Sequence, residues 1–343
     1  ASWGGTIRVR KKAAEVRIES SLAGISSSLP EPFNKSAGSV LPLVFEYKPS
    51  GGGRDQMTVS LGDAVKGRFV RRHEGGKAVV ERGAIVVGAA SLRLPERGIV
   101  VTAGFDRLDA DAWRRVFDPA GRDDAPADDA PEELPDLRLT ANHLLLWGRD
   151  LGELDVNAEN EAGLWNARIG IRNDDGALSG TGRWRPGTGA GAGTRLDFKL
   201  SAKSVEKLLA RLGHADAVRR GVATLDGSVS WRGAPVAIDY PTLEGHLKLE
   251  AESGQFNKLE PGVGRLLGIL SLQSLPRRIT LDFRDVFSEG FAFDGIDGKF
   301  AIQHGVIETK DLQIHGPSAR VFMTGSVDLG HETQNLRVRI QPA

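Results

Sequence analysis

The sequence predicts a mainly β protein, built as one long antiparallel meander with a few short helices. Apolar and polar residues alternate along most of its 343 residues, which is typical of strands with one buried face. The alternation is clearest over residues 279–285, 319–329 and 336–340. Strands with one polar and one apolar face are the usual material of antiparallel sheets.

A weak internal repeat supports the meander. Segments beginning at Leu225, Leu243 and Ile296 share the order apolar, acidic, Gly, any, apolar, any, apolar. The acidic–glycine pair is typical of a turn or bulge, and the alternation after it predicts the next strand. Repeated strand units indicate a sheet that grows by addition.

Three segments interrupt the alternation and are predicted to be helical. Residues 109–117 begin with Asp109 as a helix cap, and the helix of a predicted insert at 204–220 begins at a serine cap and ends at Gly213. The third, 261–275, starts with proline, where a helix tolerates it, and is stopped by Pro276.

Composition excludes several classes of function. Lys and Arg (45) balance Asp and Glu (45), so no excess of positive charge predicts nucleic-acid binding. The chain has no cysteine, and no two of its seven histidines have the spacing of a zinc site, so we expect no metal. The glycines at 262, 264 and 268 lack the preceding strand of a dinucleotide fingerprint. We therefore expect no cofactor and no catalytic residue.

The helix at 261–275 is the most apolar segment and has two interpretations. Its apolar face is formed by Val263, Leu266, Leu267 and Leu270, and it is too short to span a membrane. It either plugs the protein's own core or lies against lipid. In the second case Arg265, Arg277 and Arg278 are candidates for contact with lipid headgroup phosphates.

These residues also carry a family resemblance. Residues 261–278, followed by 281–294 and 305–325, resemble the C-terminal region of YhdP-type proteins, the long AsmA-like members of Gram-negative envelopes. The resemblance is strong from about 195 to 342 and looser before that. It implies a curved sheet that forms an apolar groove (a β-taco or repeating β-groove) and conducts phospholipid across the periplasm.

The resemblance, together with the alternation, gives the expected site and its setting. The candidate groove residues are Leu281, Phe283, Phe291, Phe293, Phe300, Ile302, Val321 and Met323. The expected partners are phospholipid and membranes, with an inner-membrane anchor outside this piece and the outer membrane near its C-terminal end. The competing hypothesis is an envelope assembly scaffold with a closed core, whose apolar helix docks a protein partner.

The expected organisation has three parts. Residues 1–117 form a β-groove segment that ends in a short helix, 118–136 form an acidic, proline-rich linker, and 137–343 form the C-terminal β-groove region. Both ends of the chain fall in strand-like segments, which indicates a piece of a longer protein.

Overall fold

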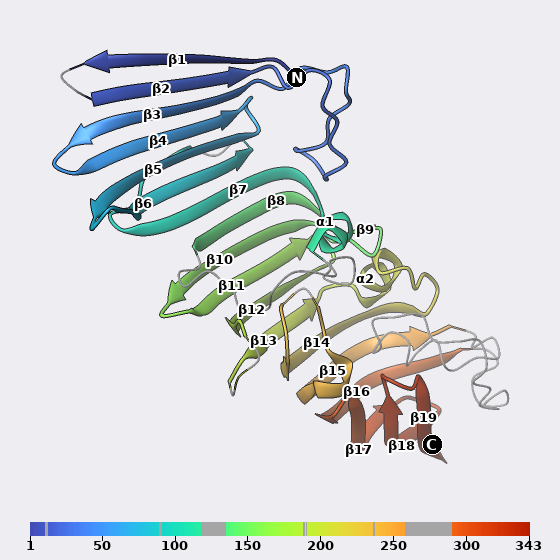
Figure 1. Cartoon of the computed structure of the whole chain (residues 1–343). Helices are drawn as coiled ribbons and strands as arrows, with labels where there is room; N and C mark the ends of the chain where they lie inside the picture. Colours follow the sequence, from blue (N-terminus) through green and yellow to red (C-terminus); the bar gives the residue numbers. More distant parts are fainter. Residues whose placement is uncertain are drawn as a thin grey trace. The chain divides into compact units, whose positions relative to one another are not determined.

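The computed structural model describes residues 1–10, 13–88, 91–117, 135–187, 189, 191–235, 237–257 and 290–343. Within these residues the chain forms 19 strands, which belong to one sheet, and two short α-helices (Figure 1). The prediction of a mainly β protein is therefore confirmed. The chain divides into two compact units, which we describe separately.

Unit 1 comprises residues 1–148 and 152–167. It contains strands β1 to β8, β10, the first part of β11 and helix α1. Their bounds are β1 (Trp3–Arg10), β2 (Ala13–Ser20), β3 (Leu43–Gly51), β4 (Arg54–Leu61), β5 (Val65–Glu74), β6 (Lys77–Gly88), β7 (Gly98–Asp109), α1 (Ala110–Phe117), β8 (Asp136–Leu146), β10 (Glu153–Glu161) and β11 (Leu164–Asn173).

The strands from β1 to β6 follow the predicted antiparallel meander, each paired with the next. Strand β7 departs from the prediction, because it pairs in parallel with both β6 and β8. Parallel neighbours need a connection that carries the chain back along the strands. The chain makes these two connections between Gly88 and Gly98 before β7, and between Asp109 and Asp136 after β7.

Unit 2 comprises residues 149–151 and 168–343. From β12 to β19 every described ladder between consecutive strands is antiparallel. The bounds are β9 (Arg149–Asp150), β12 (Gly176–Arg185), β13 (Gly193–Ala202), α2 (Val205–Arg211), β14 (Val218–Trp231), the 3-10 helix η2 (Tyr240–Thr242), β15 (Glu244–Phe256), β16 (Phe291–Gln303), β17 (Val306–His315), β18 (Ala319–Asp328) and β19 (Thr333–Pro342).

Both predicted helices that fall within the described residues are present, and both begin at the predicted cap. The backbone N–H of Ala112 donates to Asp109 Oδ1 at 2.8 Å, and that of Lys207 donates to Ser204 Oγ at 3.3 Å. The predicted insert at 204–220 was too long, because α2 ends at Arg211 and residues 218–220 already belong to β14.

The repeated acidic–glycine pair is a turn or bulge in only part of the repeat. Gly298 lies where the ladder between β16 and β17 shifts register, as predicted for a bulge. Gly227, in contrast, lies in the middle of β14, so the prediction of a turn there was wrong. A side chain at Gly227 would meet Phe198 Cζ at 2.5 Å and Leu247 Cδ2 at 2.7 Å. This glycine therefore leaves room for side chains of the neighbouring strands.

Several predictions fall on residues that the structure does not describe. The helix at 261–275, the strand at 279–285 and positions 118–134 of the linker are among them. The end of the predicted linker is described, and Asp136 already pairs with Val100 as the first residue of β8. The three-part organisation itself stays a prediction.

Candidate lipid-binding face

One face of the unit 1 sheet carries apolar side chains that are aligned from strand to strand. Alternation places them on a common face, and the register of the ladders brings them side by side. We define three rows, each of which crosses consecutive strands. The first row is Leu43, Leu61, Val65, Val87 and Ala103; the second is Ile18, Phe45, Val59, Gly67, Ile85, Val101 and Leu137; the third is Val16, Tyr47, Met57, Phe69, Gly83 and Ile99.

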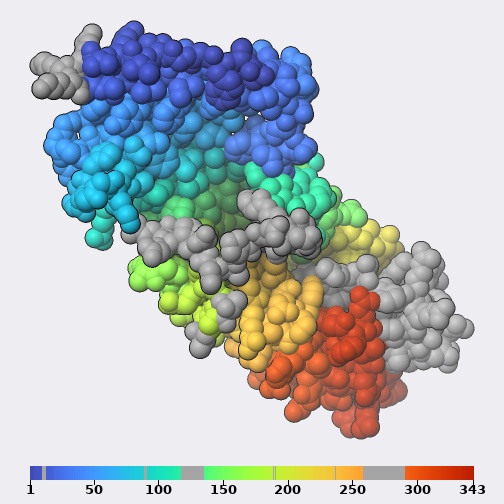
Figure 2. Space-filling view, in the orientation of Figure 1, coloured from blue at the N-terminus to red at the C-terminus, as the bar shows by residue number. Residues whose placement is uncertain are grey.

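Most of these side chains are neither buried nor fully exposed. Phe45, Met57, Val59 and Phe69 are all half-buried. The face continues onto β1, where Ile7 and Val9 are 69% and 70% exposed. Strand β1 belongs to the dark blue surface in Figure 2. Contiguous apolar surface of this kind is uncommon on soluble proteins and indicates contact with an apolar partner.

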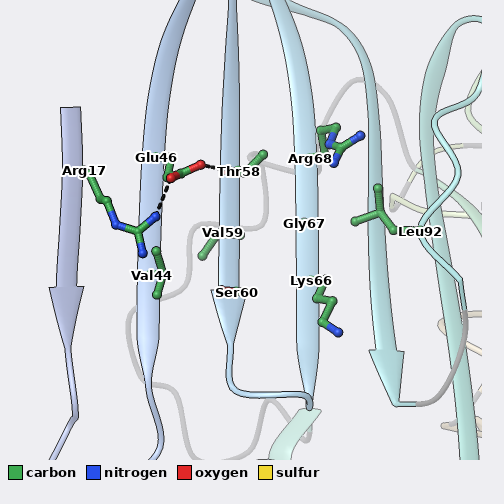
Figure 3. A pocket seen from close by; sticks show the side chains of 10 residues that line it. All are labelled: Arg17, Val44, Glu46, Thr58, Val59, Ser60, Lys66, Gly67, Arg68 and Leu92. Atoms are coloured by element: carbon green, nitrogen blue, oxygen red, sulfur yellow. Dashed lines mark hydrogen bonds and ion pairs between the residues drawn. The ribbon is translucent and has the colours of Figure 1, made fainter. Parts of the chain in front are cut away.

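The opposite face of the same strands is polar. Figure 3 shows an open depression on it, lined by Arg17, Glu46, Thr58, Lys66 and Arg68 from β2 to β5. Arg17 Nη1 lies 2.5 Å from Glu46 Oε1, so charges on this face are paired. Its lining comes mainly from residues of the parity opposite to the apolar rows, although Val59 and Gly67 of the second row also contribute.

Residues 91–97, which connect β6 to β7, help to cover the polar face. Leu92 from this connection lines the depression beside Arg68 of β5 (Figure 3). Ala84 and Val86 of β6 point to this side and are only 1% and 3% exposed. The sheet is thus covered here on its back, while the second and third apolar rows remain accessible on its front.

An ion cluster lies on the same face as the apolar rows, beside the third row, on the side that faces away from the second row. It consists of Asp55, Arg71 and His73, and Asp55 is paired with Arg71 in the ladder of β4 and β5. Arg71 Nε donates to Asp55 Oδ1 at 2.9 Å and Arg71 Nη2 to Asp55 Oδ2 at 3.0 Å, while His73 Nε2 lies 2.5 Å from Asp55 Oδ2. Arg71 also lies over the ring of Tyr47, at 6.0 Å from its centroid.

Burial and hydrogen bonding act in opposite directions on Asp55. The side chain is 1% exposed, whereas those of Arg71 and His73 are 25% and 44% exposed. Burial raises the pKa of Asp55, but the hydrogen bonds from Arg71 and His73 outweigh it and leave the pKa below its usual value of 3.8. Asp55 is therefore ionised at neutral pH, and its bonds raise the pKa of Arg71.

In unit 2 the structure brings the described groove candidates together. Phe291, Phe293, Phe300 and Ile302 of β16 belong to one apolar cluster with Val321 and Met323 of β18. The register explains this, since Ile314 of β17 pairs with Ile296 on one side and with Val321 on the other. Strict alternation alone would place Phe293 and Phe300, seven residues apart, on opposite faces; the buried positions of β16 change from odd to even between 293 and 296, and this shift brings the candidates together. Their role in a lipid groove stays a prediction.

The apolar face of unit 2, considered by itself, is deeply buried. Phe291 and Phe293 are each 3% exposed and Val321 is 2% exposed. Val205 and Leu209 of α2 pack on the cluster, and so do Tyr240 and Leu243 from the connection that contains η2. These two connections leave the sheet at opposite ends of β14, so apolar side chains close the face at both strand ends.

The other predicted site residues lie outside the described residues. They are the groove candidates Leu281 and Phe283, the helix residues Val263, Leu266, Leu267 and Leu270, and the headgroup candidates Arg265, Arg277 and Arg278. Their roles stay predictions.

Sequence reasoning missed the unit 1 face as a site, and it missed the ion cluster entirely. The signal was present, because Asp55 has the same parity as Met57, Val59 and Leu61 and therefore shares their face. Arg71 and His73 continue the parity of Val65 and Phe69 in the same way. Without the register, nothing showed that the two strands would place these charges opposite each other.

Comparison with known proteins agrees with this architecture. The family model of the YhdP protein matches residues 1–125 and 119–343. The chain belongs to the YhdP family. It is 29% identical over 212 residues to the intermembrane phospholipid transporter YhdP of Escherichia coli (strain K12), an alignment that covers 61% of this chain and 16% of that relative. No solved structure matches the chain.

The chain thus aligns with about a sixth of the length of this YhdP relative. Among the residues that the structure describes, no group of His, Asp and Glu side chains is arranged to hold a metal ion. None of the helices in this part of the chain has the length and apolar character that a membrane crossing requires.

Proposed function

We propose that this chain forms part of a conduit that carries phospholipid between the inner and outer membranes. The observation that carries the proposal is the set of aligned apolar rows in unit 1, which remain half-exposed beside a polar opposite face. Acyl chains placed on these rows would be removed from water, while the polar face keeps the protein in solution. The transporter named among its relatives supports the same substrate class.

The proposed role is passive and non-enzymatic. The lipid would move along the rows without a change in its covalent structure, so no catalytic residue is required. We place the chain in the periplasm of a Gram-negative bacterium, as part of a longer protein that is anchored in the inner membrane and approaches the outer membrane with its C-terminal end.

Photo-crosslinking tests the proposal directly. A benzophenone amino acid at Phe69 or Met323, on the apolar faces of units 1 and 2, should label co-purified phospholipid. Matched probes at Arg68 and Thr324 occupy the next positions on the same strands and point to the opposite face, so they should label little or none. Native mass spectrometry of protein prepared without detergent stripping should show bound phospholipid. Equal labelling from both faces, or protein without lipid, would contradict the proposal.

A scaffold with a closed core is the second candidate, and the burial of the unit 2 cluster favours it. Val321 at 2% exposure has the environment of an ordinary core residue. If the scaffold hypothesis is correct, the probe at Met323 should crosslink only within the chain or to one protein partner. Lipid adducts from Met323 would decide against it.

A further inference from the structure

The ion cluster of Asp55, Arg71 and His73 requires an explanation, because it lies on the apolar face of the sheet. Replacing a buried ion pair by apolar side chains is often neutral or stabilising. A charged pair at this position is therefore not needed to hold β4 and β5 together. The same strands already pair through Met57 with Phe69 and Val59 with Gly67 in the adjoining rows.

The cluster leaves accessible hydrogen-bond donors. Asp55 engages Nε and Nη2 of Arg71, which fixes the plane of the guanidinium group. Among the described residues no partner is recorded for Nη1 of Arg71, and Arg71 and His73 are both partly exposed while Asp55 is not. A ligand that approaches along the apolar face would therefore meet oriented N–H groups, with the carboxylate hidden behind them.

The position of the cluster fits the length of a lipid. Asp55 and Leu61 lie six residues apart on β4, so the cluster and the first apolar row are separated by about 20 Å, at roughly 3.3 Å per residue. One leaflet of a bilayer's hydrocarbon core is about 15 Å thick, which is the length its acyl chains occupy. A chain of this length that begins at the cluster and lies along the strand would thus cover the third and second apolar rows and extend toward the first.

The cluster also lies at the margin of the sheet, where a polar headgroup can reach water. It is next to the hairpin turns between β3 and β4 and between β5 and β6, which lie on the same side of unit 1 (Figure 1). Arginine is well suited to phosphate oxygens, because its planar donors match their geometry.

From these observations we propose that Arg71, held in place by Asp55 and flanked by His73, binds the phosphate of a lipid whose acyl chains lie on the apolar rows of unit 1. This inference rests on the proposed function and adds a defined headgroup site to it. The site would give the lipid a fixed orientation, with its chains along the strands and its headgroup at this margin.

The test compares binding of three probes to the full chain: short-chain phosphatidylglycerol, diacylglycerol with the same acyl chains, and inorganic phosphate. The double variant Asp55→Asn/Arg71→Gln removes both charges; Asn keeps the shape of Asp55, and Gln is a neutral polar side chain shorter than that of Arg71. Arg54→Gln/Glu81→Gln is the matched control. It removes the ion pair between Arg54 and Glu81, which also has two hydrogen bonds, of 2.7 and 3.0 Å. Arg54 lies on β4 next to Asp55, so its side chain leaves the strand on the opposite face.

The double variant should bind phosphatidylglycerol about tenfold or more weakly than the wild type, as expected for lost hydrogen bonds to a charged group. Its affinity for diacylglycerol should stay unchanged, and the control should bind every probe like the wild type. Arg71→Lys keeps a cation beside Asp55 but loses the planar donors. It provides a second test if the double variant unfolds, and it should also weaken phosphatidylglycerol selectively.

Three results would overturn the inference. An unchanged preference for phosphatidylglycerol over diacylglycerol in both variants would leave the cluster with a structural role alone. Inorganic phosphate that binds as tightly as phosphatidylglycerol, and depends on Arg71, would assign the site to a free anion. A wild-type chain that binds neither lipid would contradict the proposed function and this inference together.

Discussion

At the scale of single residues, Asp55 has the most unusual environment in unit 1. It is an ionised carboxylate at 1% exposure on a face of apolar side chains. One strand, β5, supplies both of its partners, Arg71 and His73, and their common face follows from the period-two alternation of that strand. The sequence alternation therefore shows which face these side chains share, but the contact of Asp55 with Arg71 depends on the register of the ladder between β4 and β5.

We expect Asp55→Asn alone to lower the free energy of unfolding by about 2–3 kcal/mol at pH 7. Removing one member of a buried pair costs about 3–5 kcal/mol, and the partial exposure of Arg71 reduces that cost. Urea denaturation provides the measurement. Asp63→Asn is the control, since the Asp63 side chain is fully exposed and should leave the stability unchanged.

The same pair gives a pH dependence with a defined sign. The pKa of Asp55 in the folded protein lies below its usual value of 3.8, so the unfolded chain takes up a proton first as the pH falls. The stability contributed by Asp55 is complete above about pH 3.8 and is lost as the pH falls through the folded-state pKa. The difference in stability between wild type and Asp55→Asn should therefore shrink below pH 3.8. A difference that grows in acid would show that the sign is wrong.

At the scale of elements, sequence reasoning predicted helices better than strand direction. Helices α1 and α2 begin at the predicted cap residues, Asp109 and Ser204. A helix cap can be predicted from sequence because its hydrogen bond joins residues only three positions apart. The parallel pairing of β7 was not predictable from alternation, which is the same for both directions. The direction of β7 depends on the connection between Gly88 and Gly98 and on how it packs against the rest of the unit, which alternation within a strand does not encode.

Gly88 is a sensitive point of the parallel ladder. Its φ is +76°, and a Cβ there would lie 2.0 Å from the backbone oxygen of Gly104 on β7. Gly88→Ala should destabilise the chain by about 2 kcal/mol or more, since both the φ value and the close approach oppose a side chain. Gly76→Ala is the matched control, with φ +83° and open space, and should cost about 1 kcal/mol. Equal shifts in the denaturation midpoint would rule out the close approach as the cause.

Arg211 adds polar bonds to the apolar packing of Val205 and Leu209 that holds helix α2 on the sheet. Arg211 Nη2 donates to Asp175 Oδ2 at 2.8 Å, and Nη1 donates to the backbone oxygen of Asp150 at 3.1 Å. Arg211→Ala should therefore lower the local stability of α2 by about 2 kcal/mol while the strands remain intact. Hydrogen exchange should report faster exchange over residues 205–211 and little change in β14. Lys207→Ala, at an exposed position of the same helix, should leave exchange unaffected.

At the scale of the whole molecule, the sequence of a single strand shows which side chains share a face, but it does not show what covers that face. The candidates on β16 and β18 form one cluster, but only because the alternation of β16 changes phase between residues 293 and 296. What covers a face depends on the connections, such as α2 over unit 2 and residues 91–97 behind unit 1. This is why the named groove candidates all lie in the C-terminal half, although a β-groove was predicted for residues 1–117 as well and the more accessible apolar rows lie in unit 1.

A charge placed on the second row tests the face as a whole. Val59→Asp should reduce the fraction of lipid-bound protein in native mass spectra severalfold, because an acyl chain would have to desolvate a carboxylate. Thr58→Asp, one residue earlier on the polar face, should leave lipid binding near the wild-type level. Strand content in circular dichroism should be retained in both variants. A similar loss of lipid in both would argue against a one-sided path.

The parallel position of β7 means that the covalent chain and the hydrogen-bonded sheet follow different routes between β6 and β7. The ladder joins the two strands directly through seven residue pairs, from Arg82 with Gly98 to Gly88 with Gly104. The peptide chain instead passes through a separate connection, which contributes Leu92 to the polar face. Cleavage of the exposed peptide bond between Glu96 and Arg97 would therefore divide the chain and leave the pairing of β6 with β7 intact. The two fragments, produced separately, should therefore recombine into one particle, and the apolar rows would run unbroken across a chain made of two pieces.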